Sequence, residues 1–166
     1  MKNTQIQFDI ISQIQSVLHT AGIPFWLRGG WAVDFLLERI TREHSDIDLV
    51  AWKRHAVQLR SLFEQADFTF MRDTGVQYDF TKCGQEISVV FISQIRGELF
   101  VEGIPDWVWL PEALSLPPQE LDGSFCHVLS PAQLLEEKVG YQKDTGRSPR
   151  TKDLQSMKTL NQIIMS

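Results

Sequence analysis

Residues 26–52, "WLRGGWAVDFLLERITREHSDIDLVAW", carry the strongest fold signal in this chain. The stretch opens with a short apolar run that ends in Gly29 and Gly30, a pattern that predicts a buried strand followed by a turn. A helix is expected over about 31–39, and a second strand over 45–52, where aspartates and apolar residues alternate. The sequence therefore predicts a strand, helix, strand unit with glycines at its first turn and two aspartates on its last strand.

The glycine pair has a chemical and a structural interpretation. Because glycine has no Cβ, backbone N–H groups at Gly29 and Gly30 can come close to a ligand. The helix start adds unpaired N–H donors and the positive end of the helix dipole, which suit a phosphate group. Tight packing between a strand and a helix would also need these glycines, so the pair alone does not separate the two interpretations.

Asp46 and Asp48 are expected to share one face of their strand, because side chains on a strand repeat every second residue. Two carboxylates held close together repel each other unless a cation or a proton relieves the charge. Paired hard oxygen ligands suit Mg²⁺ that bridges a substrate phosphate. The alternative is a solvated edge strand with ordinary acidic residues.

Composition favours a small globular enzyme or binding protein. The chain has 166 residues, of which 43% are hydrophobic and 22% charged, and this predicts one domain over 1–166, with a sheet-containing core over 1–129 and helices over 130–166. The net charge of -5 argues against nucleic acid as the partner and favours small molecules. No leader pattern or long apolar run is present, so we expect a cytoplasmic protein without membrane contact.

Elsewhere the pattern predicts helices at both ends and short strands between them. Thr4 is a candidate cap for the first helix, and 104–123 is interpreted as a surface excursion because it holds four of the seven prolines. The expected helices are 4–22, 54–68, 131–143 and 150–164, and the expected strands are 68–72, 76–82, 86–92, 97–103 and 124–130. The fold class is α/β (α+β), with a mixed sheet flanked by helices.

The composite motif closely resembles the signature of the aminoglycoside and lincosamide nucleotidyltransferases, which belong to the DNA-polymerase-β-like nucleotidyltransferase superfamily. Its pattern is a strand, Gly-Gly-Trp, Asp34 three residues after Trp31, and then Arg-x-His-x-Asp-Ile-Asp. The resemblance implies the polymerase-β-like fold with C-terminal helices. It also implies that Gly29 and Gly30 hold a nucleoside triphosphate.

The same resemblance implies that Asp46 and Asp48 bind two Mg²⁺ ions. Arg42 is then a candidate forked donor to phosphate, with a solvent-facing arginine or a pair with Glu43 as the alternative. His44 either orients the carboxylate strand or contacts the nucleotide. For Asp34, which belongs to the motif, we expect a structural hydrogen bond.

A third carboxylate, which the family pattern has on a later strand, is missing here. The matching strand is "QEISVVFI", where Ser88, or Val89 if the alignment shifts by one residue, occupies the expected place. Glu86 and Ser88 are expected to face the cleft. Glu86 on the same face, or Asp79 on the preceding strand, is a candidate replacement for the catalytic carboxylate. Alternatively, the chain binds nucleotide without transferring it.

Basic residues near the C-terminus complete the predicted site. Lys152 is a candidate triphosphate ligand together with Arg150, at a helix expected to start at Pro149. Lys138 and Tyr141 lie on one face of the preceding helix and are further candidates. A solvated basic first turn is the alternative for Arg150 and Lys152.

The expected reaction is Mg²⁺-dependent transfer of a nucleoside monophosphate, AMP from ATP, to a hydroxyl of a small acceptor such as an aminoglycoside or lincosamide. ATP is the expected donor, with other nucleoside triphosphates left open. The competing hypothesis is an inactive relative that binds nucleotide or regulates a partner in the manner of an antitoxin. A homodimer is also left open.

Overall fold

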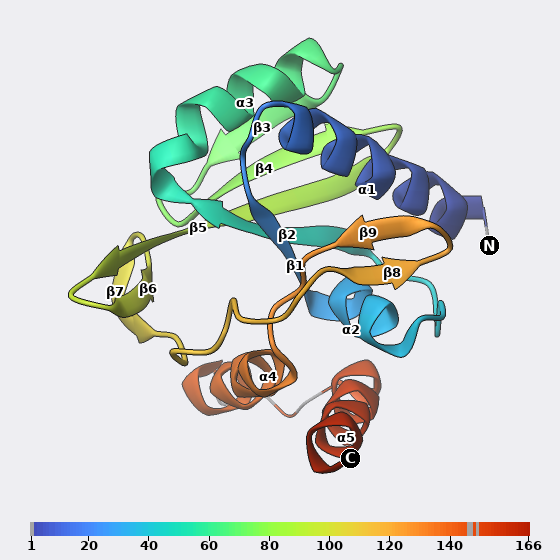
Figure 1. The fold of residues 1–166 in the computed structure, drawn as a ribbon, viewed down its shortest axis with the longest axis vertical. Helices are drawn as coiled ribbons and strands as arrows, with labels where there is room; N and C mark the ends of the chain where they lie inside the picture. Colours follow the sequence, from blue (N-terminus) through green and yellow to red (C-terminus); the bar gives the residue numbers. More distant parts are fainter. Residues whose placement is uncertain (1, 146–147, 149) are drawn as a thin grey trace.

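The computed structural model describes residues 2–145, 148 and 150–166, which form a mixed sheet between two groups of helices (Figure 1). Helices α1 (Lys2–Thr20) and α3 (Ala56–Gln65) cover one face of the sheet. The other group contains α2 (Gly29–Leu37), α4 (Pro131–Thr145) and α5 (Thr151–Met165). This arrangement confirms the predicted α/β class with a mixed sheet and helices at the C-terminus.

Within the described residues, seven strands form the main sheet in the order β1-β2-β5-β4-β3, with β6 and β7 paired beyond β5. Strands β2 and β5 are parallel, and the other neighbours are antiparallel. The strands of the sheet are β1 (Phe25–Arg28), β2 (Asp46–Trp52), β3 (Thr69–Asp73), β4 (Gln77–Lys82), β5 (Gln85–Ile95), β6 (Glu98–Val101) and β7 (Ile104–Val108). A separate hairpin joins β8 (Gln119–Leu121) and β9 (Ser124–Cys126).

The centre of the sheet is anchored by alternating apolar residues that point toward α1 and α3. Ile47 and Leu49 on β2, and Ile87 and Val89 on β5, are fully buried. On the α3 side, Phe63 packs edge-on against Phe80 at a centroid distance of 5.0 Å. Because side chains alternate along a strand, this burial turns Asp46, Asp48, Glu86 and Ser88 to the opposite face.

Helix starts differ from the sequence prediction in two places. α1 begins at Lys2, so Thr4 lies inside the helix and is buried there, and its prediction as a cap is wrong. α2 begins at Gly29, so both glycines belong to its first turn and do not precede it. The predicted helix start at Pro149 and the side chain of Tyr141 lie outside the described residues.

The proline-rich stretch 104–123 is only partly a surface excursion. It contains β7 and β8, and Trp109 and Ala113 within it are buried. The Trp109 backbone N–H donates to the Leu99 carbonyl at 2.8 Å, which ties the segment to the sheet. Such a contact depends on the tertiary fold, and periodicity within the segment does not reveal it.

Among the described residues, no helix is both long enough and apolar enough to cross a membrane.

Candidate nucleotide-binding site

The start of α2 is built around two glycines that pack against polar side chains. Gly29 has φ of +68°, and a Cβ at this position would lie 2.7 Å from Asp48 Oδ2. A Cβ on Gly30 would overlap the His44 ring at Nδ1 and would lie 2.9 Å from Arg42 Nη2. Both glycines are therefore required for the strand and the loop to approach the helix start.

Apart from Tyr141, whose side chain is not described, the residues predicted to bind nucleotide or metal line one cavity of about 110 Å³. Its walls come from the start of α2, from the loop and strand that follow, and from the two C-terminal helices. The lining residues are Gly29, Gly30, Arg42, His44, Ser45, Asp46, Asp48, Lys138, Arg150 and Lys152. Backbone donors, carboxylates and basic side chains thus meet at one place.

Asp46 and Asp48 are half-buried on the same face of β2. Burial, together with the nearby Asp46 and Glu137 carboxylates, raises the pKa of Asp48 to about 6, although Arg28 and Lys138 act in the opposite direction. The pair is therefore a site where negative charge is held close together and partly out of water. A cation at this position would relieve the repulsion.

Arg28 and Glu137 join the end of β1 to α4 beneath Asp48. Arg28 Nε donates to Glu137 Oε2 at 3.3 Å, and β1 and β2 place Arg28 opposite Asp48. Burial alone would lower the pKa of Arg28, but Glu137 and Asp48 raise it above its ordinary value. Sequence analysis missed both residues, although the place of Arg28 directly before the glycines was an available signal.

His44 is held by a buried carboxylate. Its Nε2 lies 2.6 Å from Asp34 Oδ2, and Thr41 Oγ1 donates to Asp34 Oδ1 at 2.6 Å, so the hydrogen bond expected at Asp34 is present. The His44 Nδ1 atom is buried and has no hydrogen-bond partner within the described part of the chain, and the His44 side chain lines the cavity. His44 is thus both anchored by α2 and turned toward the candidate nucleotide site.

Arg42 does not pair with the Glu43 carboxylate in the structure. Its Nη1 donates to the Glu43 backbone carbonyl at 2.9 Å, and its guanidinium reaches over Gly30. The Glu43 carboxylate therefore takes no part in this hydrogen bond, and the Arg42 guanidinium lines the cavity.

An ion-pair network holds the C-terminal wall. Lys138 Nζ and Arg150 Nε donate to the two oxygens of Asp153 at 2.7 and 2.8 Å. Burial opposes ionisation of Asp153, yet its hydrogen bonds with Arg150 and Lys138 hold its pKa below the ordinary value. The pKa of Lys152 is lowered by burial and by the neighbouring Arg150 and Arg42 charges, so this wall concentrates positive charge.

Glu86 lies outside this cavity. The register places it beside Asp46 on the next strand, where it is exposed and lines a different cavity of about 260 Å³ together with Ser88 and Asp79. Glu86 and the metal-ligand candidates therefore share a face of the sheet but not a cavity.

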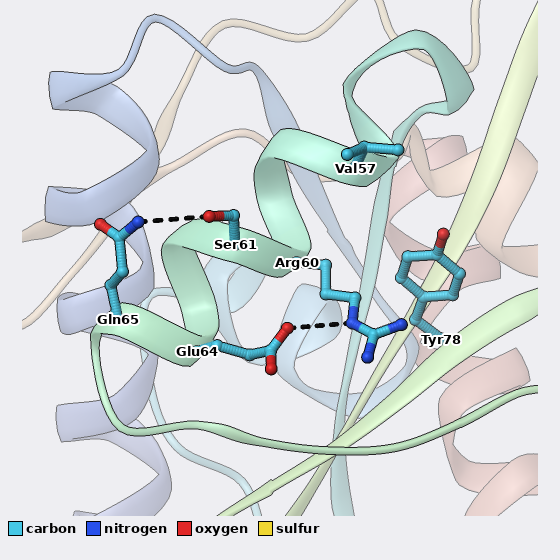
Figure 2. Close-up of a pocket in the computed structure, with 6 residues that line it drawn as sticks. All are labelled: Val57, Arg60, Ser61, Glu64, Gln65 and Tyr78. Carbon is cyan, nitrogen blue, oxygen red and sulfur yellow. Dashed lines mark hydrogen bonds and ion pairs between the residues drawn. The ribbon is translucent and has the colours of Figure 1, made fainter.

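A further hollow lies at α3, and Figure 2 shows the residues that line it. Its volume is about 700 Å³. Arg60 donates to Glu64 at 2.9 Å on its wall, and Tyr78 of β4 lies opposite (Figure 2). Tyr78 alternates with Asp79 along β4 and so faces the α3 side of the sheet. This hollow shares no lining residue with the cavity at Gly29, Gly30, Asp46 and Asp48, and among the described residues no glycine or aspartate lines its wall.

The carboxylate pair fits Mg²⁺ that is bound together with a substrate. Among the described residues, no group of three or more His, Cys, Asp or Glu side chains is arranged to hold a metal by itself. Mg²⁺ is commonly held by one or two carboxylates plus substrate phosphates. Asp46 and Asp48, next to a phosphate-type helix start, supply that donor set.

The fold is that of solved nucleotidyltransferase structures. A TM-score of 0.79 relates it to the crystal structure of ANT(2'')-Ia in complex with adenylyl-2''-tobramycin, at 20% identity over 96% of this chain and 90% of that one. The lincomycin-bound lincosamide antibiotic adenylyltransferase LnuA gives 0.72, at 18% identity over 90% of this chain and 92% of the other. These similarities confirm the predicted fold.

The chain belongs to the aminoglycoside-2''-adenylyltransferase family, whose sequence profile matches residues 10–160. Curated relatives named 2''-aminoglycoside nucleotidyltransferase, from Klebsiella pneumoniae and Escherichia coli, are 29% identical over 116 residues, which is 70% of this chain. The matched part spans 56% of the length of these relatives. The family resemblance predicted from residues 26–52 is confirmed.

Proposed function

We propose that this protein transfers a nucleoside monophosphate, AMP from ATP, to a hydroxyl of a small molecule in a Mg²⁺-dependent reaction that releases pyrophosphate. The observation that carries the proposal is the meeting of the α2 start, the Asp46 and Asp48 carboxylates and the C-terminal cations around one cavity. Phosphoryl-type transfer needs these parts, because its catalysis consists largely of positioning and charge stabilisation.

Each part has a distinct role in the proposal. Backbone N–H groups at Gly29 and Gly30 bind the triphosphate, and Arg42, His44 and Lys152 add side-chain donors from two sides. Asp46 and Asp48 hold Mg²⁺, two ions in the complete site, and bound Mg²⁺ neutralises phosphate charge and orients the reacting oxygens. Glu86 remains a candidate catalytic carboxylate on the neighbouring strand.

An aminoglycoside is the first acceptor to test. The curated relatives are named for the 2'' position of aminoglycosides, and one structural neighbour is described with adenylyl-2''-tobramycin. The net charge of -5 and the exposed Glu86 favour a cationic acceptor over a neutral one. Lincosamides are the second class, because LnuA is described with lincomycin.

The decisive experiment incubates the protein with Mg²⁺, each of four nucleoside triphosphates, and a panel that contains tobramycin, other aminoglycosides and lincomycin. We expect mass spectrometry to detect an aminoglycoside that carries one adenylyl group, and pyrophosphate in equal amount. Omission of Mg²⁺ should remove the product. No nucleotidyl adduct with any acceptor, at protein concentrations that bind ATP, would refute transfer.

A second candidate function is nucleotide binding without transfer, in a regulatory protein. The observation that favours it is Ser88, a residue without charge at the point where β5 passes Asp48. ATP binding measured by calorimetry together with no adduct would support this candidate. Adduct formation would exclude it.

A further inference from the structure

Three polar residues form a row across neighbouring strands beside the candidate metal ligands. Asp48 on β2 is opposite Ser88 on β5, and Ser88 is opposite Asp79 on β4. Neighbouring strands are about 4.8 Å apart, so Ser88 lies one strand from Asp48 and Asp79 lies two strands away, about 9–10 Å. A carboxylate on β4 is therefore too remote to act at Asp48 directly, but Ser88 lies between them.

Ser88 and Asp79 are joined by a hydrogen bond of defined direction. The Ser88 hydroxyl donates to Asp79 Oδ1 at 3.1 Å, so its hydrogen points toward the carboxylate. A hydroxyl oxygen has two acceptor sites, of which the long 3.4 Å contact from Gln77 Nε2 occupies one. The Ser88 oxygen can therefore accept a hydrogen bond from a hydroxyl that approaches from the Asp48 side.

Asp79 is fixed by one contact from its own strand, β4, and one from the neighbouring strand β3. Gln77 Nε2 donates to Asp79 Oδ1 at 2.7 Å, and Arg72 Nε lies 3.0 Å from Asp79 Oδ2. Its side chain is only 18% exposed, whereas that of Arg72 is 62% exposed. The carboxylate is thus oriented toward Ser88 by one oxygen, while its other oxygen pairs with Arg72 at the rim.

Glu86 is less well placed for the same task. It is opposite Asp46 and lies two residues from Ser88, about 6.6 Å along the strand. It is exposed, and within the described part of the chain its carboxylate makes no hydrogen bond or ion pair. Nothing in the structure therefore orients Glu86 toward the point where an acceptor would meet the nucleotide.

We propose that Ser88 and Asp79 together accept the proton of the acceptor hydroxyl, an inference that rests on the proposed function. The acceptor oxygen attacks the α-phosphorus and forms the new P–O bond, while the bond to the bridging oxygen breaks and pyrophosphate leaves. The acceptor proton passes to Ser88 Oγ as the Ser88 proton passes to Asp79. Ser88 contacts the substrate and is the catalytic residue, and Asp79 acts through it.

The cavity next to this pair provides room for the acceptor. It has a volume of about 260 Å³, and Asp79, Ser88 and Glu86 line it on the face that carries Asp46 and Asp48. An acceptor bound in this cavity would lie on the β4 side of β5, and the nucleotide would lie at Asp48 on the β2 side. The hydroxyl that reacts would then pass directly over Ser88.

The test compares Ser88→Ala, Asp79→Asn, Glu86→Gln and the control Glu98→Gln, an exposed residue on β6. General-base assistance contributes about 100- to 10,000-fold, so we expect kcat to fall at least ~100-fold in Ser88→Ala and Asp79→Asn. The Kd for ATP, the KM for the acceptor and the melting temperature should stay close to wild type. The Glu98→Gln control should be unchanged.

A rescue experiment separates proton transfer from a structural role of Asp79. The double variant Asp79→Asn with Ser88→Asp puts a carboxylate directly on β5, and we expect it to recover most of the lost kcat. A merely structural Asp79 would not be replaced in this way. If Asp79→Asn fails to fold, the kcat of Ser88→Ala tests the inference by itself. This variant loses only one hydroxyl and keeps the contacts of Asp79 with Arg72 and Gln77.

The outcomes distinguish this inference from the proposed function. Wild-type protein that forms no adduct overturns both. Wild-type transfer with full kcat in Ser88→Ala, or a loss seen only in Glu86→Gln, overturns the inference and leaves the proposed function standing.

Discussion

The two walls of the candidate nucleotide cavity are held in place by different kinds of contact. The N-terminal wall, residues 29–48, contributes backbone N–H groups and the Asp46 and Asp48 carboxylates, and it is held by sheet register and by close glycine packing. The C-terminal wall, formed by Lys138, Arg150 and Lys152, contributes cations. It is held by an ion pair from Lys138 of α4 to Asp153 of α5 and by a local pair from Arg150 to Asp153 at the start of α5. Both carboxylates of the candidate site thus come from the first part of the chain, whereas its cations come from both parts: Arg42 from the first, and Lys138, Arg150 and Lys152 from the second.

Because the two walls are held differently, we expect them to be sensitive to different substitutions. Packing leaves no space at Gly29 and Gly30, so small changes of volume there should be costly. The C-terminal wall depends on charge, so it should respond to pH and to loss of a single ionic group. Five substitutions in four experiments test this contrast, in order of decreasing effect.

Removal of a carboxylate should have the largest effect. Asp46→Asn or Asp48→Asn should abolish Mg²⁺-dependent triphosphate binding and lower transfer by more than ~1,000-fold, because metal charge stabilisation contributes several kcal/mol. The fold should remain intact or be slightly stabilised, since two crowded like charges become one. Calorimetry with ATP and Mg²⁺ measures this, with exposed Asp106→Asn on β7 as the control. Unchanged ATP affinity in both variants would contradict the metal site.

Gly30→Ala should cost about 2–3 kcal/mol of transition-state or binding free energy through overpacking. The new methyl group would overlap His44 Nδ1 and push the ring or Arg42 away from the phosphate position. ATP titration measures the loss of binding, and thermal unfolding measures the loss of stability. Gly140→Ala in α4 is the matched control, because a Cβ there meets nothing within 4 Å, and it should be neutral or slightly stabilising. Equal behaviour of the two variants would show that the α2 start is loosely packed.

Asp153→Asn should destabilise the protein by about 1.5–3 kcal/mol at pH 7, since two charge-assisted hydrogen bonds are weakened. The folded-state pKa of Asp153 is below its unfolded value of 3.8, so its stabilisation is present above that value and is lost as pH falls below it. The difference in melting temperature between wild type and variant should therefore be full at pH 7, begin to shrink as pH falls below about 3.8, and continue to shrink toward the still lower folded-state pKa. A constant difference across that range would mean that Asp153 acts by packing alone.

Lys152→Met should have the smallest effect, about a tenfold rise in the Kd for ATP, which corresponds to ~1.4 kcal/mol. The side chain keeps its length but loses the charge that Lys152 brings to the cavity. Lys158→Met on the exposed face of α5 makes the same change of net charge away from the site and should leave the Kd unaltered. If both variants weaken binding equally, the effect is a general one of net charge.

Local pattern was sufficient to predict the N-terminal wall. Gly29, Gly30, Asp46 and Asp48 lie within 20 residues of each other, and period-two alternation alone places the aspartates on one face. The strands and helices were also predictable, because apolar spacing reports which side of each element is buried. Errors arose at ends and in 104–123, where contacts with distant residues override local preference.

Contacts between distant segments decided the rest of the site. Arg28 with Glu137, and Lys138 with Asp153, are partners only because α4 and α5 fold back beneath β1 and β2. The hydrogen bond from Ser88 to Asp79 likewise depends on the register between β4 and β5, and a shift of one residue would turn one of the two side chains to the opposite face. The sequence by itself determined which chemical groups each strand and helix presents, through their periodicity. Which groups meet was decided by the tertiary structure, because strand register and helix docking depend on packing across the whole core.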